Sequence, residues 1–278
     1  MSTTAGESRA GRAVKRLIRK RRERHREALR DGAVRARKFT YVFVVTYGRS
    51  GSTLTQGLLN TLPRTLVRGE NNLYVLSMFR AERLAKTFKK QHSKHGAGSI
   101  SSAFYGLREM RMAEFARTTG ELVTSQLLGG ADPREVDAIG FKEVLWHRVT
   151  AEETDAFFSF MDDAFPGARY VLNQRDHEQV VGSGFWQKFD QDEVMRAILR
   201  VEEIQEFLRK TRADQTYDTR YERVTSPDQA VADAELRGLA EFITGSCDEV
   251  LLEQLRDVLK VGHGPNPFGK SRGRRSAS

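Results

Sequence analysis

A short run of glycine and hydroxyl residues, YGRSGST from Tyr47 to Thr53, is the segment best suited to chemistry. Small residues allow backbone N–H groups to converge on one ligand, and a following helix would add the partial positive charge of its N-terminus. An arginine adds a full charge, and the hydroxyl side chains add further donors. The run therefore predicts a phosphate or sulfate site, with these candidate ligand-binding residues: Arg49, Ser50, Gly51, Ser52 and Thr53.

This run differs from the loop of nucleotide-hydrolysing P-loop proteins. That loop has the pattern G-x-x-x-x-G-K-[ST], in which the lysine reaches the β- and γ-phosphates. No lysine precedes Ser52 or Thr53 here, so the pattern disfavours a magnesium–ATP site. A plainer alternative stays open, namely a turn in which Ser52 or Thr53 only caps an ordinary helix.

A second candidate anion site follows the strand-like segment 169–173. Arg175 comes two residues after the end of this segment, and Ser183 follows eight residues later. Ligands of doubly wound sheets bind at the carboxyl ends of the strands, so we expect both residues to face the crevice that holds the first loop. Two anion sites in one crevice would suit a nucleotide with phosphates on both ends of an adenosine. The alternative is that Arg175 pairs with Asp176 or Glu178 at the surface and that Ser183 is incidental.

The elements that must position both motifs are those of an α/β protein. Residues 40–46 are β-branched and aromatic, as expected of a strand buried on both faces of a parallel sheet. Leucines between 54 and 62 then repeat at helical spacing, and Pro63 ends that helix. Two more strands are predicted at 138–141 and 169–173. This order predicts a P-loop-like three-layer α/β fold with a central, mostly parallel sheet flanked by helices.

Further helices are predicted between and after these strands. Residues 73–128 carry apolar side chains at mixed helical spacing, and we expect them to form helices over the site. An amphipathic pattern from Val194 to Leu208 predicts another helix, and two more are expected at 229–244 and 248–260.

The composition predicts one globular domain with loose ends. Of 278 residues, 39% are hydrophobic, which is enough to bury a core. The single cysteine, Cys247, excludes an intrachain disulfide, and no Cys/His cluster indicates a metal site. Because no run of 18 apolar residues and no signal-like N-terminus is present, we expect a soluble, cytoplasmic protein without a metal.

The positive charge is concentrated at the start of the chain. Residues 1–38 hold 14 Lys and Arg against 4 Asp and Glu, so the net charge of +9 leaves −1 for the remaining 240 residues. We predict a basic, helical or disordered extension at 1–38, whose residues 9–38 either contact an anionic membrane surface or acidic polymer or are simply solvated. Residues 263–278 predict a flexible basic tail, which leaves 39–262 as the main domain. Its charge gives no reason to expect specific nucleic-acid binding.

The two motifs, in this order, resemble those of the PAPS-dependent sulfotransferases, which take a sulfuryl group from 3′-phosphoadenosine-5′-phosphosulfate. The resemblance covers residues 40–260 and implies that 49–53 bind the 5′-phosphosulfate, whereas Arg175 and Ser183 bind the 3′-phosphate. Arg49 stands where the family often has lysine, and His177 stands where it usually has proline. The family fold and activity imply PAPS as the donor and PAP as the product, with 39–262 as the sulfotransferase domain.

Shorter segments resemble the glycan-acting and bacterial members of that family. They are Gly69–Asn72, Gly140–Glu143 and Ser183–Trp186. Tyr221–Val224 resembles a tyrosine–glutamate segment that the family as a whole has on a late strand. The resemblance to the glycan-acting and bacterial members implies a carbohydrate or glycolipid acceptor and assigns the catalytic base to Glu70. Lesser candidates for an acid, base or sulfuryl contact are Glu143, Lys142, His147, His92 and His95.

The implied reaction is in-line transfer of the sulfuryl group to an acceptor hydroxyl or amine. Glu70 would accept the proton, while Arg49 and the loop N–H groups would stabilise the charge on the leaving nucleotide. A plainer interpretation of Glu70 is a capping carboxylate ahead of a helix that starts near Leu73. Two other functions compete with this one: an ATP-dependent phosphotransferase with a degenerate P-loop, and a non-catalytic protein that binds anions or membranes through its basic N-terminus.

Overall fold

The computed structural model describes residues 37–94, 98–182 and 189–261. The chain divides into two units, Met1–Lys38 and Phe39–Ser278. The predicted tail at 263–278 and all but the last two residues of the predicted extension lie outside the described residues. All described helices and strands belong to the second unit.

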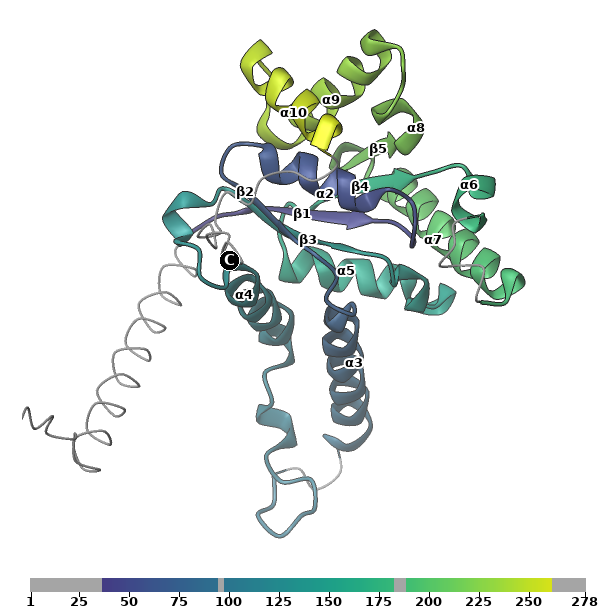
Figure 1. Cartoon of the computed structure of the whole chain (residues 1–278). Helices are drawn as coiled ribbons and strands as arrows, with labels where there is room; N and C mark the ends of the chain where they lie inside the picture. Colours follow the sequence, from purple (N-terminus) through teal and green to yellow (C-terminus); the bar gives the residue numbers. More distant parts are fainter. Residues whose placement is uncertain (1–36, 95–97, 183–188, 262–278) are drawn as a thin grey trace, which may run out of the picture. The chain divides into compact units, whose positions relative to one another are not determined.

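Five parallel strands form one sheet in the order β2-β3-β1-β4-β5 (Figure 1). They are β1 (Thr40–Val45), β2 (Thr65–Arg68), β3 (Ala138–Glu143), β4 (Arg169–Gln174) and β5 (Thr216–Arg220). The central strand β1 has Thr40 opposite Ala138 on one side and Val42 opposite Arg169 on the other. Because every strand points the same way, all five carboxyl ends meet at one edge of the sheet.

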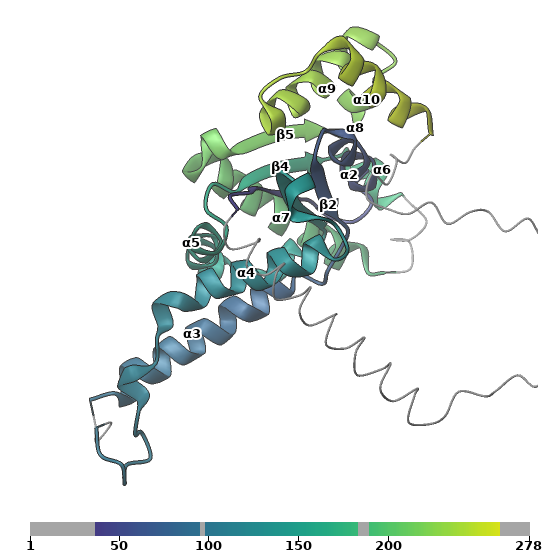
Figure 2. The ribbon, with the colours of Figure 1, turned by 90° about the vertical axis from the view of Figure 1, so that its left-hand side faces the viewer.

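Helices cover both faces of this sheet, which gives three layers (Figures 1 and 2). One layer contains α2 (Ser52–Thr61), α9 (Gln229–Thr244) and α10 (Glu249–Val261). The other contains α3 (Tyr74–His92), α4 (Phe115–Leu128), α5 (Thr154–Ala164) and α7 (Gln191–Thr211). Short helices α6 (His177–Val181) and α8 (Tyr221–Val224) follow β4 and β5 directly. Single turns of 3-10 helix lie at Leu107–Glu109, Met112–Glu114, Pro133–Glu135, Trp146–Arg148, Ala151–Glu153 and Ala213–Gln215. The predicted α/β fold with a sheet between helices is confirmed.

Alternation along β1 sends its side chains into two different cores. Val42 and Val44 are fully buried with Leu58 and Leu59 of α2, in the core that α9 and α10 complete. Phe43 points to the opposite face, where its ring lies 4.8 Å from Phe141 within an aromatic core. Burial on both faces explains why the strand is apolar at every position.

The predicted strands at 40–46, 138–141 and 169–173 are confirmed, with ends that differ by one or two residues. The sequence pattern did not predict β2 and β5. The first has only four residues, and the second, TYDTR, forms a polar edge of the sheet, so neither carries a strong hydrophobic pattern.

The predicted helices at 54–62, 194–208, 229–244 and 248–260 are also confirmed. The expectation that 73–128 covers the site needs correction. In this region α4 packs on β2, β3 and α5 and so covers a face of the sheet, whereas α3 packs on α4 and α5 and its second half projects away from the sheet (Figures 1 and 2). Among the described residues, no helix is both long and apolar enough to cross a membrane.

A close helix crossing depends on Gly120 of α4, where an added Cβ would lie 1.9 Å from the carbonyl oxygen of Ala164 in α5. Alanine is a better helix former than glycine by about 1 kcal/mol, so in an open helix Gly→Ala stabilises. Here we expect Gly120→Ala to lower the free energy of unfolding by roughly 1–3 kcal/mol, because α4 must move away from α5. Urea denaturation measures the change. The matched control is Thr118→Ala at an exposed position of α4, which should be neutral or slightly stabilising; equal stability of the two variants would contradict the close crossing.

Candidate functional site

The loop between β1 and α2 has the backbone shape of an anion-binding turn. Arg49 and Gly51 adopt left-handed conformations, with φ of 67° and 80°. Gly51 is the N-cap of α2, and no side chain caps this helix end. Neither Ser52 nor Thr53 therefore caps this helix with its side chain, which was the plainer alternative. An N-terminus without a side-chain cap leaves N–H groups for a ligand.

The hydroxyl groups of the loop have different roles. Ser50 is fully buried, and its Oγ lies 2.6 Å from Oγ1 of Thr46. Ser52 is also buried, whereas Thr53 and Arg49 are exposed. Ser50 thus supports the loop from inside with its hydroxyl, and Arg49 and Thr53 offer the accessible side chains.

Asn173, near the end of β4, holds the loop in place. Its Oδ1 accepts a hydrogen bond from Oγ1 of Thr55 (2.5 Å), and its Nδ2 donates to the carbonyl oxygen of Ser50 (3.0 Å). Its own carbonyl oxygen accepts from Oγ1 of Thr46 (2.9 Å). From α7, Nε2 of Gln205 donates to the carbonyl oxygen of Val45 at the start of the loop (2.8 Å). This buried network joins β1, α2, β4 and α7.

Arg175 reaches the same loop, as the sequence predicted. The hydroxyl of Tyr47 donates to the carbonyl oxygen of Arg175 (2.9 Å) and accepts from its N–H (3.1 Å). Burial raises the pKa of Tyr47 to about 12, so the phenol keeps the proton that it donates. The Arg175 guanidinium donates through Nη1 to the carbonyl oxygen of Arg49 (3.3 Å). Arg175, from the second candidate anion site, therefore contacts the loop of the first at the carboxyl edge of the sheet.

The alternative in which Arg175 forms an ion pair with Asp176 or Glu178 is not found among the contacts of the described residues. Asp176 instead caps α6, where its side chain accepts from the N–H groups of Glu178 (2.9 Å) and Gln179 (3.4 Å). The Arg175 guanidinium donates to Oε1 of Gln179 (3.1 Å). Ser183 and the segment to Trp186 lie outside the described residues, so the predicted role of Ser183 stays a prediction.

Tyr221 is a site residue whose place the sequence did not indicate. It is the first residue of α8, directly after β5, which corrects the expectation that Tyr221–Val224 lies on a late strand. Its ring lies 4.2 Å from the Arg175 guanidinium carbon. A Cβ on Gly51 would lie 2.1 Å from the same ring, so only glycine permits this contact. The Tyr221 ring therefore lies beside both the loop, at Gly51, and Arg175.

Glu143, at the end of β3, shapes the other side of the site. This fully buried carboxylate accepts four backbone N–H groups: Asn71 (3.0 Å), Leu73 (2.8 Å), Val144 (2.8 Å) and Leu145 (3.2 Å). Both of its oxygens are used by the backbone, so Glu143 is a structural residue and not an accessible acid or base.

Glu70 stands on the turn that Glu143 holds. Its Oε1 accepts from Nζ of Lys142 at 2.5 Å. The lysine side chain is only 6% exposed, whereas that of Glu70 is 51% exposed and so is accessible to a substrate. The N-cap residue of α3 is Leu73, and no side chain forms a capping hydrogen bond at this helix end. Glu70 therefore does not cap α3, which was the plainer interpretation.

Other polar groups near Glu70 have no protein partner. Both polar atoms of the Asn71 side chain and the hydroxyl of Tyr74 are buried without a hydrogen bond from any described residue. Such groups often mark a place for water or a ligand.

The three candidate histidines lie in different surroundings. His147 is half-buried, and this burial lowers its pKa. The ring of His92 stacks on that of Phe104, with 4.5 Å between the ring centroids, and His95 lies outside the described residues.

A cavity of about 480 Å³ opens beside Arg175 at the carboxyl edge of the sheet. It is lined by Gln174, Arg175, Asp176, His177, Glu202, Glu206, Arg209 and Arg220. Polar contacts cross it, and Nε2 of His177 lies 2.8 Å from Oε1 of Glu202. In the described part of the chain, no group of three or more His, Cys, Asp or Glu residues could hold a metal ion.

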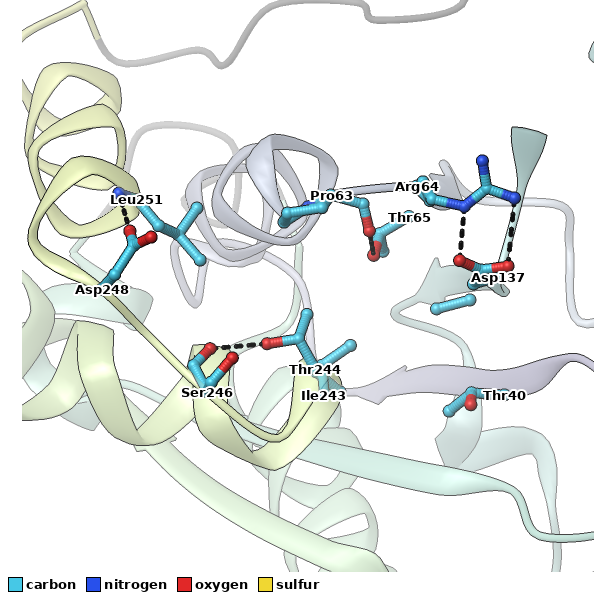
Figure 3. A pocket seen from close by; sticks show the side chains of 11 residues that line it. Thr40, Pro63, Arg64, Thr65, Asp137, Ile243, Thr244, Ser246, Asp248 and Leu251 are labelled. Carbon is cyan, nitrogen blue, oxygen red and sulfur yellow. Dashed lines mark hydrogen bonds and ion pairs between the residues drawn. The ribbon is translucent and has the colours of Figure 1, made fainter.

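A second cavity, of about 470 Å³, lies at the opposite edge of the sheet, near the first residues of β1, β2 and β3 (Figure 3). Its polar groups bond to one another. Arg64 forms an ion pair with Asp137, and Oγ1 of Thr244 donates to the carbonyl oxygen of Ser246 (2.7 Å). This cavity does not belong to the loop site.

No protein-family model matches the chain, and a search of curated proteins found no match.

The Asn173 network predicts a specific effect on the loop. Asn173→Ala leaves the Ser50 carbonyl and the Thr55 hydroxyl unpaired, and we expect a loss of about 1–3 kcal/mol in the free energy of unfolding together with weaker binding of anionic nucleotides. Urea denaturation and calorimetric titration measure the two effects.

The matched control is Asn60→Ala at the far end of α2. Asn60 exchanges two hydrogen bonds with the backbone of Val67 in β2, so its loss should cost similar stability without weakening nucleotide binding. Equal binding by the two folded variants would show that Asn173 does not shape the site.

Proposed function

We propose that this protein is a PAPS-dependent sulfotransferase, which transfers a sulfuryl group to a hydroxyl or amine of a carbohydrate or glycolipid acceptor. The observation that carries the proposal is the contact between the Arg175 guanidinium and the loop before the uncapped N-terminus of α2. The N-terminus of α2 and the Arg175 guanidinium are two separate sources of positive charge at one edge of the sheet, and they suit a nucleotide with two separate phosphate groups. The resemblance of both motifs to this family adds the identity of the donor.

The donor would lie along the carboxyl edge of the sheet. In this proposal, the loop residues 49–53 contact the 5′-phosphosulfate through backbone N–H groups and the Arg49 side chain. Arg175 binds the 3′-phosphate, with Ser183 as its predicted partner. Tyr221 presents an aromatic face beside Arg175 that limits where the nucleotide can lie.

The chemical step requires a base near the acceptor. As the acceptor oxygen or nitrogen forms its bond to sulfur, Glu70 takes its proton, and the bond from sulfur to the 5′-phosphate oxygen breaks. PAP leaves with the electron pair of that bond, and Arg49 with the loop N–H groups stabilises the new charge. Lys142 orients the Glu70 carboxylate through their ion pair. A cytoplasmic location is part of the same proposal.

An ATP-dependent phosphotransferase is the second candidate. It is supported by the sheet order and the loop before α2, but the loop lacks the lysine of a P-loop. A magnesium requirement for nucleotide binding would distinguish it from the sulfotransferase.

The donor site can be tested by calorimetric titration without magnesium. We expect PAP to bind tightly, AMP to bind weakly because it lacks the 3′-phosphate, and ATP to bind weakly. Arg175→Ala should weaken PAP binding about tenfold or more while changing AMP binding little, because a charge-assisted hydrogen bond is lost. Arg64→Ala removes the same charge at the opposite edge of the sheet and should leave PAP affinity unchanged. Binding of ATP only with magnesium, or of no nucleotide, would refute the proposal.

The base can be tested by Glu70→Gln. With PAPS and a panel of carbohydrate and glycolipid acceptors, we expect turnover to PAP to fall by about 10²–10⁴-fold while PAP affinity stays unchanged. Glu253→Gln breaks an ion pair with Arg256 on α10 and should keep full turnover. Normal turnover of Glu70→Gln would move the base to another residue.

A further inference from the structure

The described part of residues 83–111, namely 83–94 and 98–111, comprises the second half of α3 and the segment after it and forms an arm that projects from the sheet (Figures 1 and 2). The first half of α3 is anchored by buried residues, among them Leu76 and Phe79. Between 83 and 94 no described residue is buried. The arm is therefore supported at its base only.

Apolar side chains are exposed on this arm at high density. Of the nine large hydrophobic side chains exposed among the described residues, five lie between 83 and 111. They are Leu84, Phe88, Ile100, Tyr105 and Met110. Ile100 and Leu84, at 84% and 73% exposure, are the two most exposed of all nine. Isolated apolar side chains on a surface need no explanation, but a concentration on one element indicates an interaction surface.

The arm is a built structure rather than a loose excursion. Nζ of Lys89 donates to the carbonyl oxygens of Arg108 (2.9 Å) and Met110 (2.6 Å), and Nε of Arg108 donates to that of Ser93 (2.6 Å). These bonds hold the returning segment against α3. The exposed apolar side chains thus belong to a defined surface.

The charge of the arm is opposite to that of the rest of the domain. Residues 83–111 hold 7 Lys and Arg against 1 Asp or Glu, a net charge of +6. The remainder of the predicted domain, residues 39–82 and 112–262, holds 21 Lys and Arg against 32 Asp and Glu, a net charge of −11. An anionic surface would attract the arm and repel the rest, which defines one orientation of approach.

We propose that the arm docks on a lipid bilayer that contains anionic lipids. Leu84, Ile100 and Tyr105 enter the interfacial region, and Lys90 and Lys94 contact the anionic headgroups. A projecting arm with apolar and cationic side chains suits a soft, planar, negatively charged surface, which needs no matching pocket. The aromatic Tyr105 is of the type enriched at membrane interfaces.

This docking surface is separate from the proposed catalytic site. If the proposed function also holds, α3 sets the distance between them, because it starts four residues after Glu70 and its 19 residues span about 28 Å. That arrangement would suit an acceptor whose polar headgroup stands above a bilayer, such as a glycolipid.

The test uses the full chain and cosedimentation with vesicles of phosphatidylcholine alone or with 30% phosphatidylserine. We expect binding to the anionic vesicles only. Two variants of the arm should each bind about tenfold more weakly or worse: the triple variant Leu84→Ser, Ile100→Ser, Tyr105→Ser and the double variant Lys90→Glu, Lys94→Glu. Because the full chain keeps the basic residues 1–38 in every variant, the difference between variants reports on the arm.

Matched controls carry the same changes elsewhere on the domain. Leu199→Ser with Val250→Ser removes exposed apolar side chains, and Lys210→Glu with Lys260→Glu reverses two exposed charges. Both should bind vesicles like the wild type, and all variants should keep their affinity for PAP, so failure of the docking surface is distinguishable from failure of the proposed function.

Three results would overturn the proposal. They are no binding of the wild type to anionic vesicles, equal binding by wild type and arm variants, and a wild-type dimer in light scattering that the triple variant dissociates. The last result would assign the arm to contact with a second copy of the chain.

Discussion

The hydrogen bonds of the Asn173 side chain join two strands at the point where each delivers its candidate ligand-binding residues. Through Thr55 and the Ser50 carbonyl, this carboxamide holds the loop after β1 against β4, and Arg175 follows two residues later. The group is 1% exposed, so each of its hydrogen bonds forms without competition from water. The position of α2, the shape of the loop and the approach of Arg175 all depend on this contact.

A second buried polar group, the Glu143 carboxylate, holds another turn in place on the other side of β1. The Glu143 carboxylate collects four backbone N–H groups and thereby fixes the turn that carries Glu70. A buried carboxylate is costly unless it is fully hydrogen-bonded, and here the hydrogen bonds come from the turn itself. The site is thus built from two halves, an anion-binding half set by Asn173 and a half with Glu70 and Lys142 set by Glu143. Both halves lie at the carboxyl edge because all five strands are parallel.

Charge is divided between parts of the domain in a way that matches these roles. Cationic side chains lie at two places, namely at the loop site, where Arg49 and Arg175 meet, and on the arm of residues 83–111. The remainder of residues 39–262 is acidic. Within residues 39–262, this acidic remainder reduces non-specific attraction to polyanions everywhere except at the two basic places. The net charge of the whole chain, +9, conceals this division.

The sequence by itself determined the three strongest strands, the helices near 54–62, 194–208, 229–244 and 248–260, and the loop from Tyr47 to Thr53, because each is a local pattern of apolar periodicity, glycine and proline. It also indicated that Arg175 would reach that loop, since parallel strands share one carboxyl edge. Only the tertiary structure decided which side chains meet. Lys142 lies beside Glu70, 72 residues away, and Tyr221 packs on Gly51 and Arg175. It also decided that Glu143 is a buried support and that the arm stands apart from the sheet. The physical reason is that these contacts depend on strand order and on packing between distant segments, about which local periodicity carries no information.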